Sequence, residues 1–317
     1  MNNKTKLLSF ILIMTVLHSA CSNITQTSNN SEDIANNNTK LVVYASFYPI
    51  YDFTNIIGSD YIDLNLIVPA GAEPHHYEIS AKTMANLEKA DLILLNGLEF
   101  ETWADSLPES LEAKIIRIGE SVNPLPYREH SHEAEEIDSG HSPSEFDPHI
   151  WLDPIRAIDI SKIIYESLAS LDPSNDIAYL ENFNSLKSEL EKLDSEYQEL
   201  GNIANKKEVI VSHNAFSYLG DRYGIEFHSI SGISPENEPS LKTLTEITDL
   251  VKSKGIKVIF FEELANEKIV KTLADEAGVD SDVLYTIGGM TESEMNEGED
   301  YFSKMRLNLI KLKSAVE

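Results

Sequence analysis

Three histidines stand where an α/β chain usually places functional side chains, at turns or just beyond predicted strands. His75 follows the second predicted strand, His149 lies in an Asp-Pro-His segment, and His213 ends the strand that leads into it. Neutral imidazole nitrogens are good zinc ligands, and three of them with one further donor make a common tetrahedral set. A single histidine in a loop is more often only a polar residue, so the hypothesis of a metal site requires that all three meet.

The segment around His149 is predicted to have a fixed shape. Pro148 disfavours the helical conformation at Asp147, which places His149 in an extended or turn segment. Asp153 and Pro154 are typical of the N-cap and first position of a helix, predicted over residues 154–171. A packed aromatic turn with an incidental histidine is the alternative interpretation of this segment.

The rest of the chain alternates between apolar runs and helical patterns, which predicts an α/β fold of two similar lobes with mostly parallel sheets. The N-terminal lobe is predicted at 41–171 and the C-terminal lobe at 203–317. Predicted strands cover 41–47, 62–68, 91–96, 114–118, 208–212, 225–230, 257–262 and 283–287. Predicted helices, besides 154–171, cover 48–58, 81–89, 214–223, 241–254, 266–277 and 301–316. Ligands of such sheets gather beyond the carboxyl ends of the strands.

One long helix, predicted within 172–202, is expected to join the two lobes. Its apolar residues recur at a 4-3 spacing from Tyr179 to Leu200, which makes one continuous stripe. At 1.5 Å per residue the helix would span about 40 Å, the height of two lobes. Gly201 is predicted to follow its C-terminus. The lobes and this helix together predict a metal site in the cleft between the lobes.

The first forty residues are predicted to lie outside the fold. Residues 1–20 have a basic start and a short apolar run, as a signal peptide does, and 21–40 have the polar composition of a flexible tether. Cys21 is the only cysteine, so the chain forms no internal disulfide. The small residues before Cys21 resemble a bacterial lipobox, which implies lipidation of Cys21. An ordinary secretory signal with an unrelated cysteine is the alternative.

The charge of the chain limits its partners. Its formal net charge of −28 argues against nucleic acid, because phosphate binding needs Lys and Arg. Residues 127–145 are rich in acid and histidine and are predicted to be a mobile loop. Within this loop His130, His132 and His141 could hold a metal in an auxiliary role, or could simply belong to a solvated insertion.

Five motifs give the chain a resemblance to a known family. They are Gly71-Ala-Glu-Pro-His-His-Tyr-Glu78, Phe146-Asp-Pro-His-Ile-Trp-Leu-Asp153, Val211-Ser-His-Asn-Ala-Phe-Ser-Tyr218, the block from Gly232 to Ser240, and Phe260-Phe-Glu-Glu-Leu264. The chain resembles the zinc- or manganese-binding lipoproteins of bacterial ABC uptake systems, the metal-specific class of solute-binding proteins. The resemblance covers the chain from about Leu41 to its end.

The resemblance implies that His75, His149 and His213 bind the transported metal between two lobes bridged by a rigid helix. In this family a histidine at the third position goes with zinc. The family's fourth ligand is an acid, and Gly288 stands at that place here. Water or a carboxylate from elsewhere is therefore expected to complete the site. The candidates weighed for this position or an auxiliary role, besides the loop histidines, are Glu73, His76, Glu262, Glu263 and Asp282.

The function implied is that of a monomeric, non-enzymatic receptor, lipid-anchored to the extracytoplasmic side of the cell membrane. It would deliver Zn²⁺ to an ABC permease and its ATPase. Three other functions stay open. The same receptor could carry Mn²⁺; three histidines with an open position could serve a zinc hydrolase, although no general-base motif is present; and an exposed lipoprotein could act as an adhesin.

Overall fold

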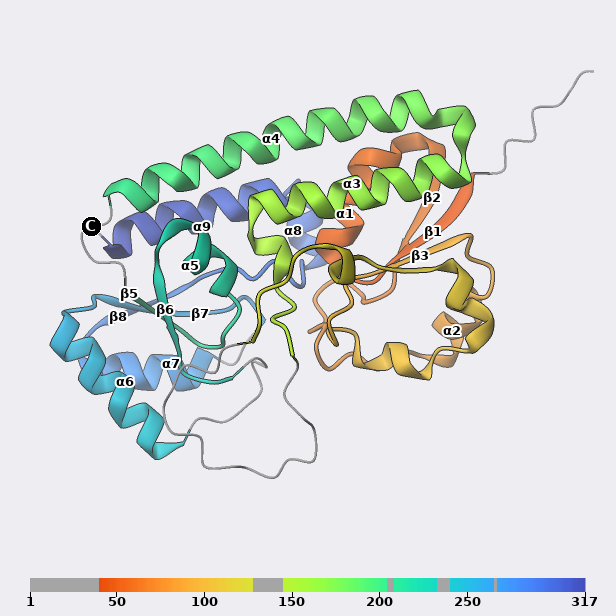
Figure 1. Cartoon of the computed structure of the whole chain (residues 1–317). Helices are drawn as coiled ribbons and strands as arrows, with labels where there is room; N and C mark the ends of the chain where they lie inside the picture. Colours follow the sequence, from red (N-terminus) through yellow and green to blue (C-terminus); the bar gives the residue numbers. More distant parts are fainter. Residues whose placement is uncertain (1–39, 128–144, 204–207, 233–239, 265–266, 317) are drawn as a thin grey trace, which may run out of the picture. The chain divides into compact units, whose positions relative to one another are not determined.

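Two parallel four-stranded sheets, one in each lobe, are the centre of the described part of the computed structural model (Figure 1). The structure describes residues 40–127, 145–203, 208–232, 240–264 and 267–316. The strand order is β2-β1-β3-β4 in the N-terminal lobe and β6-β5-β7-β8 in the C-terminal lobe, so both sheets have the same topology. This arrangement confirms the predicted α/β fold of two similar lobes.

The N-terminal lobe combines its sheet with three α-helices in the described residues. Its strands are β1 (Leu41–Ala45), β2 (Ile62–Leu66), β3 (Leu92–Leu95) and β4 (Ile115–Arg117). Its helices are α1 (Tyr48–Gly58), α2 (Ala81–Leu87) and α3 (Pro154–Leu171). Short 3₁₀ turns make up much of the remaining ordered backbone, including one at Ile150–Leu152 directly after His149. Asp153 is the N-cap of α3 and accepts a hydrogen bond from the backbone of Ile155, as the sequence predicts.

The C-terminal lobe repeats this construction. Its strands are β5 (Glu208–Val211), β6 (Glu226–Ser229), β7 (Val258–Phe261) and β8 (Asp280–Val283). Its helices are α5 (Ser217–Tyr223), α6 (Leu241–Lys254), α7 (Glu267–Ala277), α8 (Glu292–Asn296) and α9 (Tyr301–Val316). The short helix α8, closed by a capping box between Thr291 and Glu294, is absent from the sequence-based expectation.

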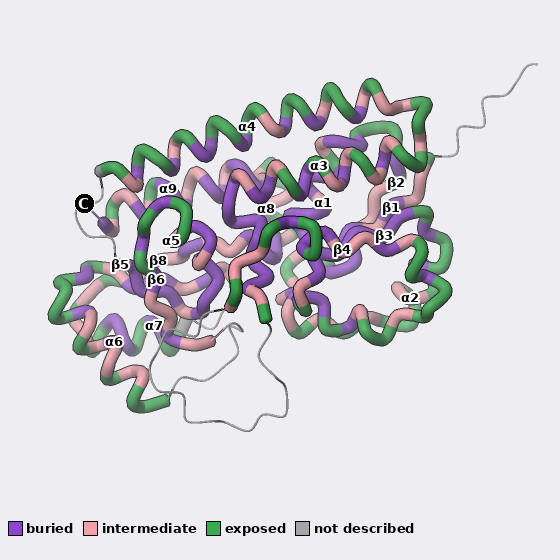
Figure 2. The backbone as a smooth tube through the Cα atoms, viewed as in Figure 1, coloured by how far each residue is buried: buried purple, intermediate pink, exposed green. Residues whose placement is uncertain are grey.

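The helix α4 (Asp176–Ile203) packs on both lobes. It contacts α1 and α3 of the N-terminal lobe and α5 and α9 of the C-terminal lobe. One of its faces is buried and the other exposed along its whole length (Figure 2). The buried face is the predicted stripe, whose residues are at most 9% exposed: Tyr179, Phe183, Leu186, Leu190, Leu193, Tyr197 and Leu200. These side chains belong to one hydrophobic cluster that includes strands of both sheets.

Several predicted boundaries differ from the structure for local reasons. The helix α4 starts at Asp176, after a 3₁₀ turn at Pro173–Asn175, and continues to Ile203, so Gly201 lies inside it. A Cβ at Gly201 would lie only 2.8 Å from the carbonyl oxygen of Tyr223, so this glycine permits a close approach of backbones. The helix α5 starts at Ser217, later than predicted, and before it the backbone of Asn214 donates to Gly232.

The last strand is the largest error of the prediction. The strand β8 ends at Val283, whereas the apolar run that predicted it covers 283–287. Leu284 still donates to the carbonyl of Phe261, and after it the backbone leaves the sheet, since Glu263 accepts hydrogen bonds from the backbone of Thr286 and Ile287. Ile287 has a φ of +61°, a conformation that a strand does not contain. The result is a loop instead of a longer strand, and this loop carries Gly288 to the space between the lobes.

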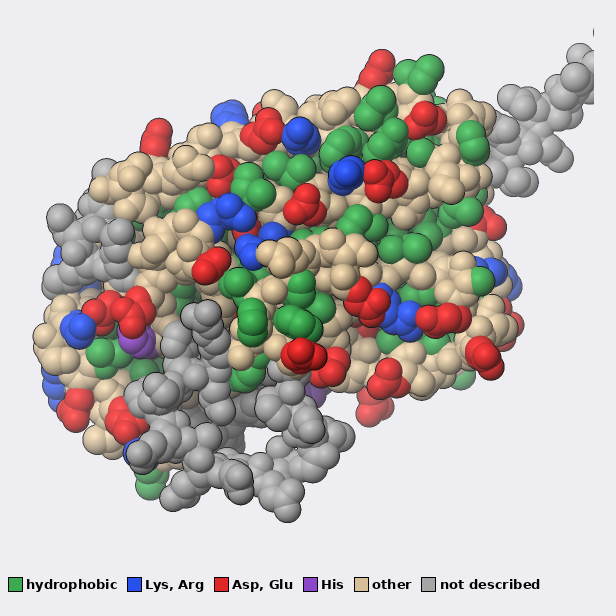
Figure 3. Space-filling view, viewed as in Figure 1, with side chains coloured by type: hydrophobic (Ala, Val, Ile, Leu, Met, Phe, Trp, Pro, Cys, Tyr) green, Lys and Arg blue, Asp and Glu red, His purple; other side chains and the backbone are tan. Residues whose placement is uncertain are grey.

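Figure 3 shows how the charged side chains are distributed on one face of the molecule. On the face drawn in Figure 3, acidic side chains are scattered among Lys, Arg and apolar residues. Within the described ranges, no helix has both the length and the apolar character needed to cross a bilayer. The predicted signal peptide, the tether with Cys21, and His130, His132 and His141 lie outside the described residues, as does most of the block from Gly232 to Ser240.

Candidate metal centre

His75 reaches the space between the lobes from a tight turn after β2. The carboxylate of Glu73 shapes this turn, because its two oxygens accept from the backbone N–H groups of His75 and His76 at 3.1 and 3.0 Å. The ring of Phe100 meets the imidazole of His75 edge-on, with the ring centroids 4.6 Å apart. Gly71 (φ +77°) donates to the carbonyl of Met290, which ties the turn to the C-terminal lobe. The position of His75 therefore depends on both lobes.

His149 is held from several directions in the Asp-Pro-His segment. One carboxylate oxygen of Asp147 accepts from both the backbone N–H and the Nδ1 of His149, at 2.9 and 2.8 Å. Asn96, directly after β3, donates to the carbonyl of Pro148 at 2.9 Å. From the C-terminal lobe, the hydroxyl of Tyr218 donates to the carbonyl of Asp147 at 2.6 Å. His149 is 1% exposed, so its ring has little freedom to turn.

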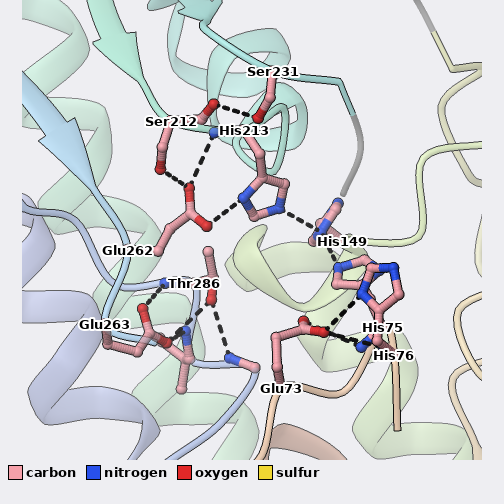
Figure 4. A network of polar contacts seen from close by, with 12 residues as sticks. Glu73, His75, His76, His149, Ser212, His213, Ser231, Glu262, Glu263 and Thr286 are labelled. Carbon is pink, nitrogen blue, oxygen red and sulfur yellow. Dashed lines mark hydrogen bonds and ion pairs between the residues drawn. The ribbon is translucent and has the colours of Figure 1, made fainter. Parts of the chain in front are cut away.

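His213 lies at the carboxyl end of β5, where the strand order of the C-terminal sheet reverses between β5 and β7. Glu262, which follows β7, accepts from the backbone N–H of His213 at 3.1 Å and pairs with its Nδ1 through the other oxygen. The hydroxyl of Ser212 also donates to Glu262. The imidazole of His213 is therefore fixed with its Nε2 turned toward the space between the lobes (Figure 4).

The Nε2 atoms of the three histidines converge. The Nε2 of His149 lies 3.2 Å from that of His75 and 3.3 Å from that of His213. Two nitrogens bound to one zinc at 2.0–2.1 Å with a tetrahedral angle are separated by about 3.3–3.4 Å. The spacing matches that of a shared ion. Among the described residues, these three form the group of ligand-type side chains close enough to hold a metal.

The surroundings favour neutral imidazoles at His75 and His149. Burial lowers the pKa of both, and the neighbouring imidazoles lower that of His75 further. Burial acts in the same direction on His213, but the carboxylate of Glu262 outweighs it, so the pKa of His213 is raised. Burial opposes the charged form of Glu262, yet its contact with His213 keeps the pKa of this carboxyl low. The cluster thus offers neutral imidazole lone pairs at His75 and His149, and the buried negative charge of Glu262 lies behind His213.

The pocket around the cluster is formed by both lobes, in agreement with the predicted site between them. Its lining includes Glu73, Pro74, Phe100 and Trp151 from the first lobe. The second lobe contributes Glu262, Glu263, Leu264, Thr286, Gly288 and Gly289. The indole of Trp151 donates to the carbonyl of Thr286 at 2.7 Å, so one hydrogen bond crosses between the lobes at the wall of the pocket.

The other candidate residues lie around the three histidines in different roles. Glu73 braces the turn of His75, and the imidazole of His76 faces Glu73, with a side chain 47% exposed. Glu262 lies behind His213 and contacts its Nδ1 rather than its Nε2. Glu263 binds the backbone after β8, and burial raises the pKa of its carboxyl to about 7. Asp282 points away and pairs with Lys311.

Some residues that support the site carry no clear signal in the sequence. The buried carboxylate of Glu101 accepts from the backbone of Asn96 and Gly97, at 2.7 and 3.0 Å. Leu98 and Glu99 within this turn have φ values of +56° and +61°, so the turn is strained, and it ends with Phe100 against His75. An Asn-Gly pair after an apolar run, with an acid four residues later, is the sequence feature that could have indicated such a turn.

The fold and the cluster define the chain as a two-lobed solute-binding protein with a metal-type site. It belongs to the ZnuA family, described as zinc-uptake complex component A, periplasmic, whose model matches residues 43–315. Among curated relatives, it is 35% identical over 280 residues to the high-affinity zinc uptake system protein ZnuA of Bacillus subtilis, covering 87% of this chain and 88% of that protein. It is 36% identical over 282 residues to the zinc-binding lipoprotein AdcA of Streptococcus pneumoniae, covering 88% of this chain.

Solved structures give the same picture. Zn(II)-bound AdcA from Streptococcus pneumoniae aligns with a TM-score of 0.74 at 37% identity, over 87% of this chain and 58% of that one. The laminin-binding protein Lmb of Streptococcus agalactiae, described as a bifunctional protein with adhesin and metal transporting activity, aligns with a TM-score of 0.77 at 30% identity, over 87% of this chain and all of that one (100%). The chain spans little more than half the length of the AdcA relatives, 56% of the curated protein.

Proposed function

We propose that this protein is a receptor that captures Zn²⁺ outside the cytoplasmic membrane with His75, His149 and His213 and delivers it to an ABC permease. The observation that carries the proposal is the spacing of the three Nε2 atoms, 3.2 and 3.3 Å around His149, which suits one tetrahedral zinc. Membership of a family described as a component of a zinc-uptake complex supports the same role.

The donor set favours zinc over manganese. All three converging atoms are imidazole nitrogens, which Zn²⁺ accepts readily, whereas Mn²⁺ prefers carboxylate, carbonyl and water oxygens. The acids that line the pocket face backbone N–H groups or His213 rather than the centre of the cluster. The names of the relatives ZnuA and AdcA, both of which mention zinc, agree with this choice.

Capture in this site would involve no bond-making chemistry. Asp147 and Glu262 hold His149 and His213 in place before the ion arrives, so binding loses little side-chain entropy at these two ligands. His75 lies on a turn that both lobes support, and it completes the set. In the part of the chain that the structure describes, the pocket acids are engaged in these supporting contacts, which argues against a general base and hence against a hydrolase.

The proposed location rests on the sequence and the relatives. Cys21, after a signal-like segment, would carry the lipid, and residues 21–40 would tether the two lobes to the membrane. The family is described as periplasmic and AdcA as a lipoprotein, which supports an extracytoplasmic, lipid-anchored protein. The permease and its ATPase are the proposed partners, and the receptor is proposed to act as a monomer.

A zinc titration of the purified protein tests the proposal directly. We expect one tightly bound Zn²⁺ per chain, measured by competition with a chromophoric chelator, and a large loss of affinity when His75, His149 or His213 is replaced by Ala. The variant His228→Ala changes a histidine of β6 that pairs with Glu208 of β5, and it serves as a control for overall integrity. Zinc binding that is unchanged in the triple alanine variant would contradict the assignment.

Zinc uptake by cells tests the second half of the proposal. Cells that make the His149→Ala variant should accumulate less zinc from chelator-treated medium than cells with the unchanged protein, at equal amounts of receptor. Equal uptake by the two strains would show that the site does not serve transport, even if it binds zinc in the purified protein.

A further inference from the structure

The segment that carries His149 is held at both of its ends by one helix of the other lobe. The segment runs from Asp147 to Asp153, and the side chains that hold it, Tyr218 and Arg222, are four residues apart on α5. Side chains at this spacing lie on the same face of a helix. The helix starts four residues after His213, so one short element connects His213 of the second lobe with the His149 segment of the first.

The hydroxyl of Tyr218 completes the backbone pairing that positions Asp147. The backbone strands around Leu125 and Asp147 run antiparallel, with a bridge between Pro126 and Phe146. The N–H of Asp147 donates directly to the carbonyl of Leu125 at 3.0 Å. In the other direction the tyrosine hydroxyl stands between the two groups. It accepts from the N–H of Leu125 at 3.0 Å and donates to the carbonyl of Asp147 at 2.6 Å.

The backbone of Asp147 matters for the site because its carboxylate holds the imidazole of His149 through Nδ1 at 2.8 Å. Tyr218 has no exposed surface (0%), so loss of its hydroxyl would leave a buried N–H and a buried carbonyl without the group that joins them. Unpaired buried polar groups cost free energy, so the backbone of Leu125 and Asp147 would shift to satisfy them. Such a shift would move His149.

Arg222 acts at the other end of the segment. The buried carboxylate of Asp153 caps α3 by accepting from the N–H of Ile155, pairs with Arg156 of its own lobe, and pairs across the lobes with the Nε of Arg222. The guanidinium of Arg156 lies over the ring of Tyr218, 4.6 Å from the ring centroid, where a cation is attracted by the ring. The contacts of Tyr218 and Arg222 therefore belong to one network.

We propose that Tyr218 and Arg222 are positioning residues for the metal. From α5 they hold the segment 147–153 so that the Nε2 of His149 stays 3.3 Å from that of His213, at a distance that one ion can share. The proposal rests on the proposed function, because it requires the histidines to bind the ion. It makes metal affinity depend on two side chains of the second lobe that are not themselves ligands.

Matched tyrosine variants of the purified protein test the contact of Tyr218. Tyr218→Phe removes the hydroxyl at the segment, whereas Tyr223→Phe removes a buried hydroxyl of the same helix that donates to Asp194 of α4 at 2.9 Å. In chelator competition we expect zinc affinity to fall by roughly 5- to 50-fold in Tyr218→Phe, somewhat less than the usual loss for a direct partner of a ligand. Zinc affinity should be unchanged in Tyr223→Phe.

Matched arginine variants test the contact of Arg222. Arg222→Gln removes the ion pair with Asp153, and Arg306→Gln removes an ion pair between α9 and Glu196 of α4. Both arginine side chains are partly exposed, 30% and 35%, so neither change empties a core position. We expect Arg222→Gln to bind zinc more weakly than the unchanged protein and Arg306→Gln to bind it equally well.

Cobalt separates a positioning role from a purely structural one. The visible absorption of Co²⁺ depends on the geometry of its ligands, whereas a lower free energy of unfolding does not change the spectrum of the molecules that are folded and loaded. With excess Co²⁺, the spectra of Tyr218→Phe and Arg222→Gln should differ from that of the unchanged protein. The spectra of Tyr223→Phe and Arg306→Gln should match it.

The proposal is overturned if either Tyr218→Phe or Arg222→Gln binds zinc as tightly as its control, or if affinity falls while the Co²⁺ spectrum stays the same. If Tyr218→Phe does not fold, the arginine pair decides by the same two measurements. Failure of the proposed function looks different: the unchanged protein would bind neither Zn²⁺ nor Co²⁺, or binding would survive in His149→Ala.

Discussion

At the scale of single residues, two of the three histidines of the site each have an acid behind the ring. His149 pairs with Asp147, and His213 pairs with Glu262. In both pairs the carboxylate contacts the Nδ1 atom of the ring, which leaves the lone pair of Nε2 free to bind a metal. Glu262 was a candidate auxiliary ligand in the sequence, and the structure places it behind His213 instead. Its contribution would be to orient the ring and to supply charge to the ligand.

Replacement of Glu262 by Gln tests this supporting role. The variant keeps the shape of the side chain but removes its charge, so we expect zinc affinity to fall by roughly 10- to 100-fold, the usual effect of losing such a partner. Chelator competition measures the change. The control is Glu208→Gln, which weakens a carboxylate–histidine contact with His228 away from the site. Unchanged zinc affinity in a folded Glu262→Gln protein would remove the orienting role.

At the scale of elements, the contact between α1 and α9 joins a helix of the first lobe to one of the second. Asp52 of α1 accepts from the backbone N–H of Tyr301, at the N-terminus of α9, at 3.2 Å. A carboxylate at a helix N-terminus is normally stabilised there. Burial outweighs this effect, with a smaller contribution from Asp300, and raises the pKa of Asp52 to about 6. At neutral pH the carboxylate of Asp52 is therefore ionised, and its burial in this contact destabilises that charged form.

The stability of the protein should depend on pH through Asp52. Because the pKa of this carboxyl is raised from 3.8 to about 6 on folding, its contribution is fully present below about pH 4 and is lost as the pH rises through 6. In Asp52→Asn that dependence disappears. Relative to the variant, the unchanged protein should lose on the order of 2–3 kcal/mol of unfolding free energy between pH 4 and pH 7.

Urea unfolding at a series of pH values measures this difference. Asp60→Asn removes the same charge at an exposed position just after α1 and serves as the matched control. If the difference between the unchanged protein and Asp52→Asn stays constant from pH 4 to pH 7, Asp52 does not titrate with a raised pKa in the folded protein.

At the scale of the whole molecule, the apolar stripe of α4 connects the two lobes through one hydrophobic cluster. Leu190, in the middle of this stripe, has no exposed surface (0%). The lobes described between residues 40 and 316 therefore share this large cluster, and each lobe has a smaller hydrophobic cluster of its own as well. The shared cluster keeps His75 of one lobe in register with His213 of the other, so the two lobes should unfold together.

Leu190→Ala should destabilise both lobes at once, by about 2–5 kcal/mol, the usual cost of emptying a buried leucine site. Both tryptophans, Trp103 and Trp151, lie in the first lobe, so their fluorescence reports that lobe while far-ultraviolet circular dichroism reports the whole chain. We expect the two signals to shift together in urea. Ile177→Ala, on an exposed position of the same helix (75%), should change stability by less than about 0.5 kcal/mol. Two separated transitions would contradict a shared core.

The sequence by itself determined the fold class, the long helix and the three histidines of the candidate site. These features depend on local patterns: alternating apolar runs, the 4-3 stripe from Tyr179 to Leu200, and an Asp-Pro-His segment whose proline restricts its own neighbours. The helices α1, α3, α6 and α9 have the predicted bounds for the same reason. The family motifs added the expectation that the histidines meet.

Only the tertiary structure decided the distances between the histidines and the roles of the acids around them. Glu262 is far from His213 in the chain, and no local pattern shows that its carboxylate lies behind that ring. The same holds for Glu263, whose contacts with Thr286 and Ile287 end β8 early and form the loop of Gly288. Such contacts depend on how two strands and a loop pack in three dimensions, because the free energy of a buried carboxylate is set by the partners around it rather than by its neighbours in sequence.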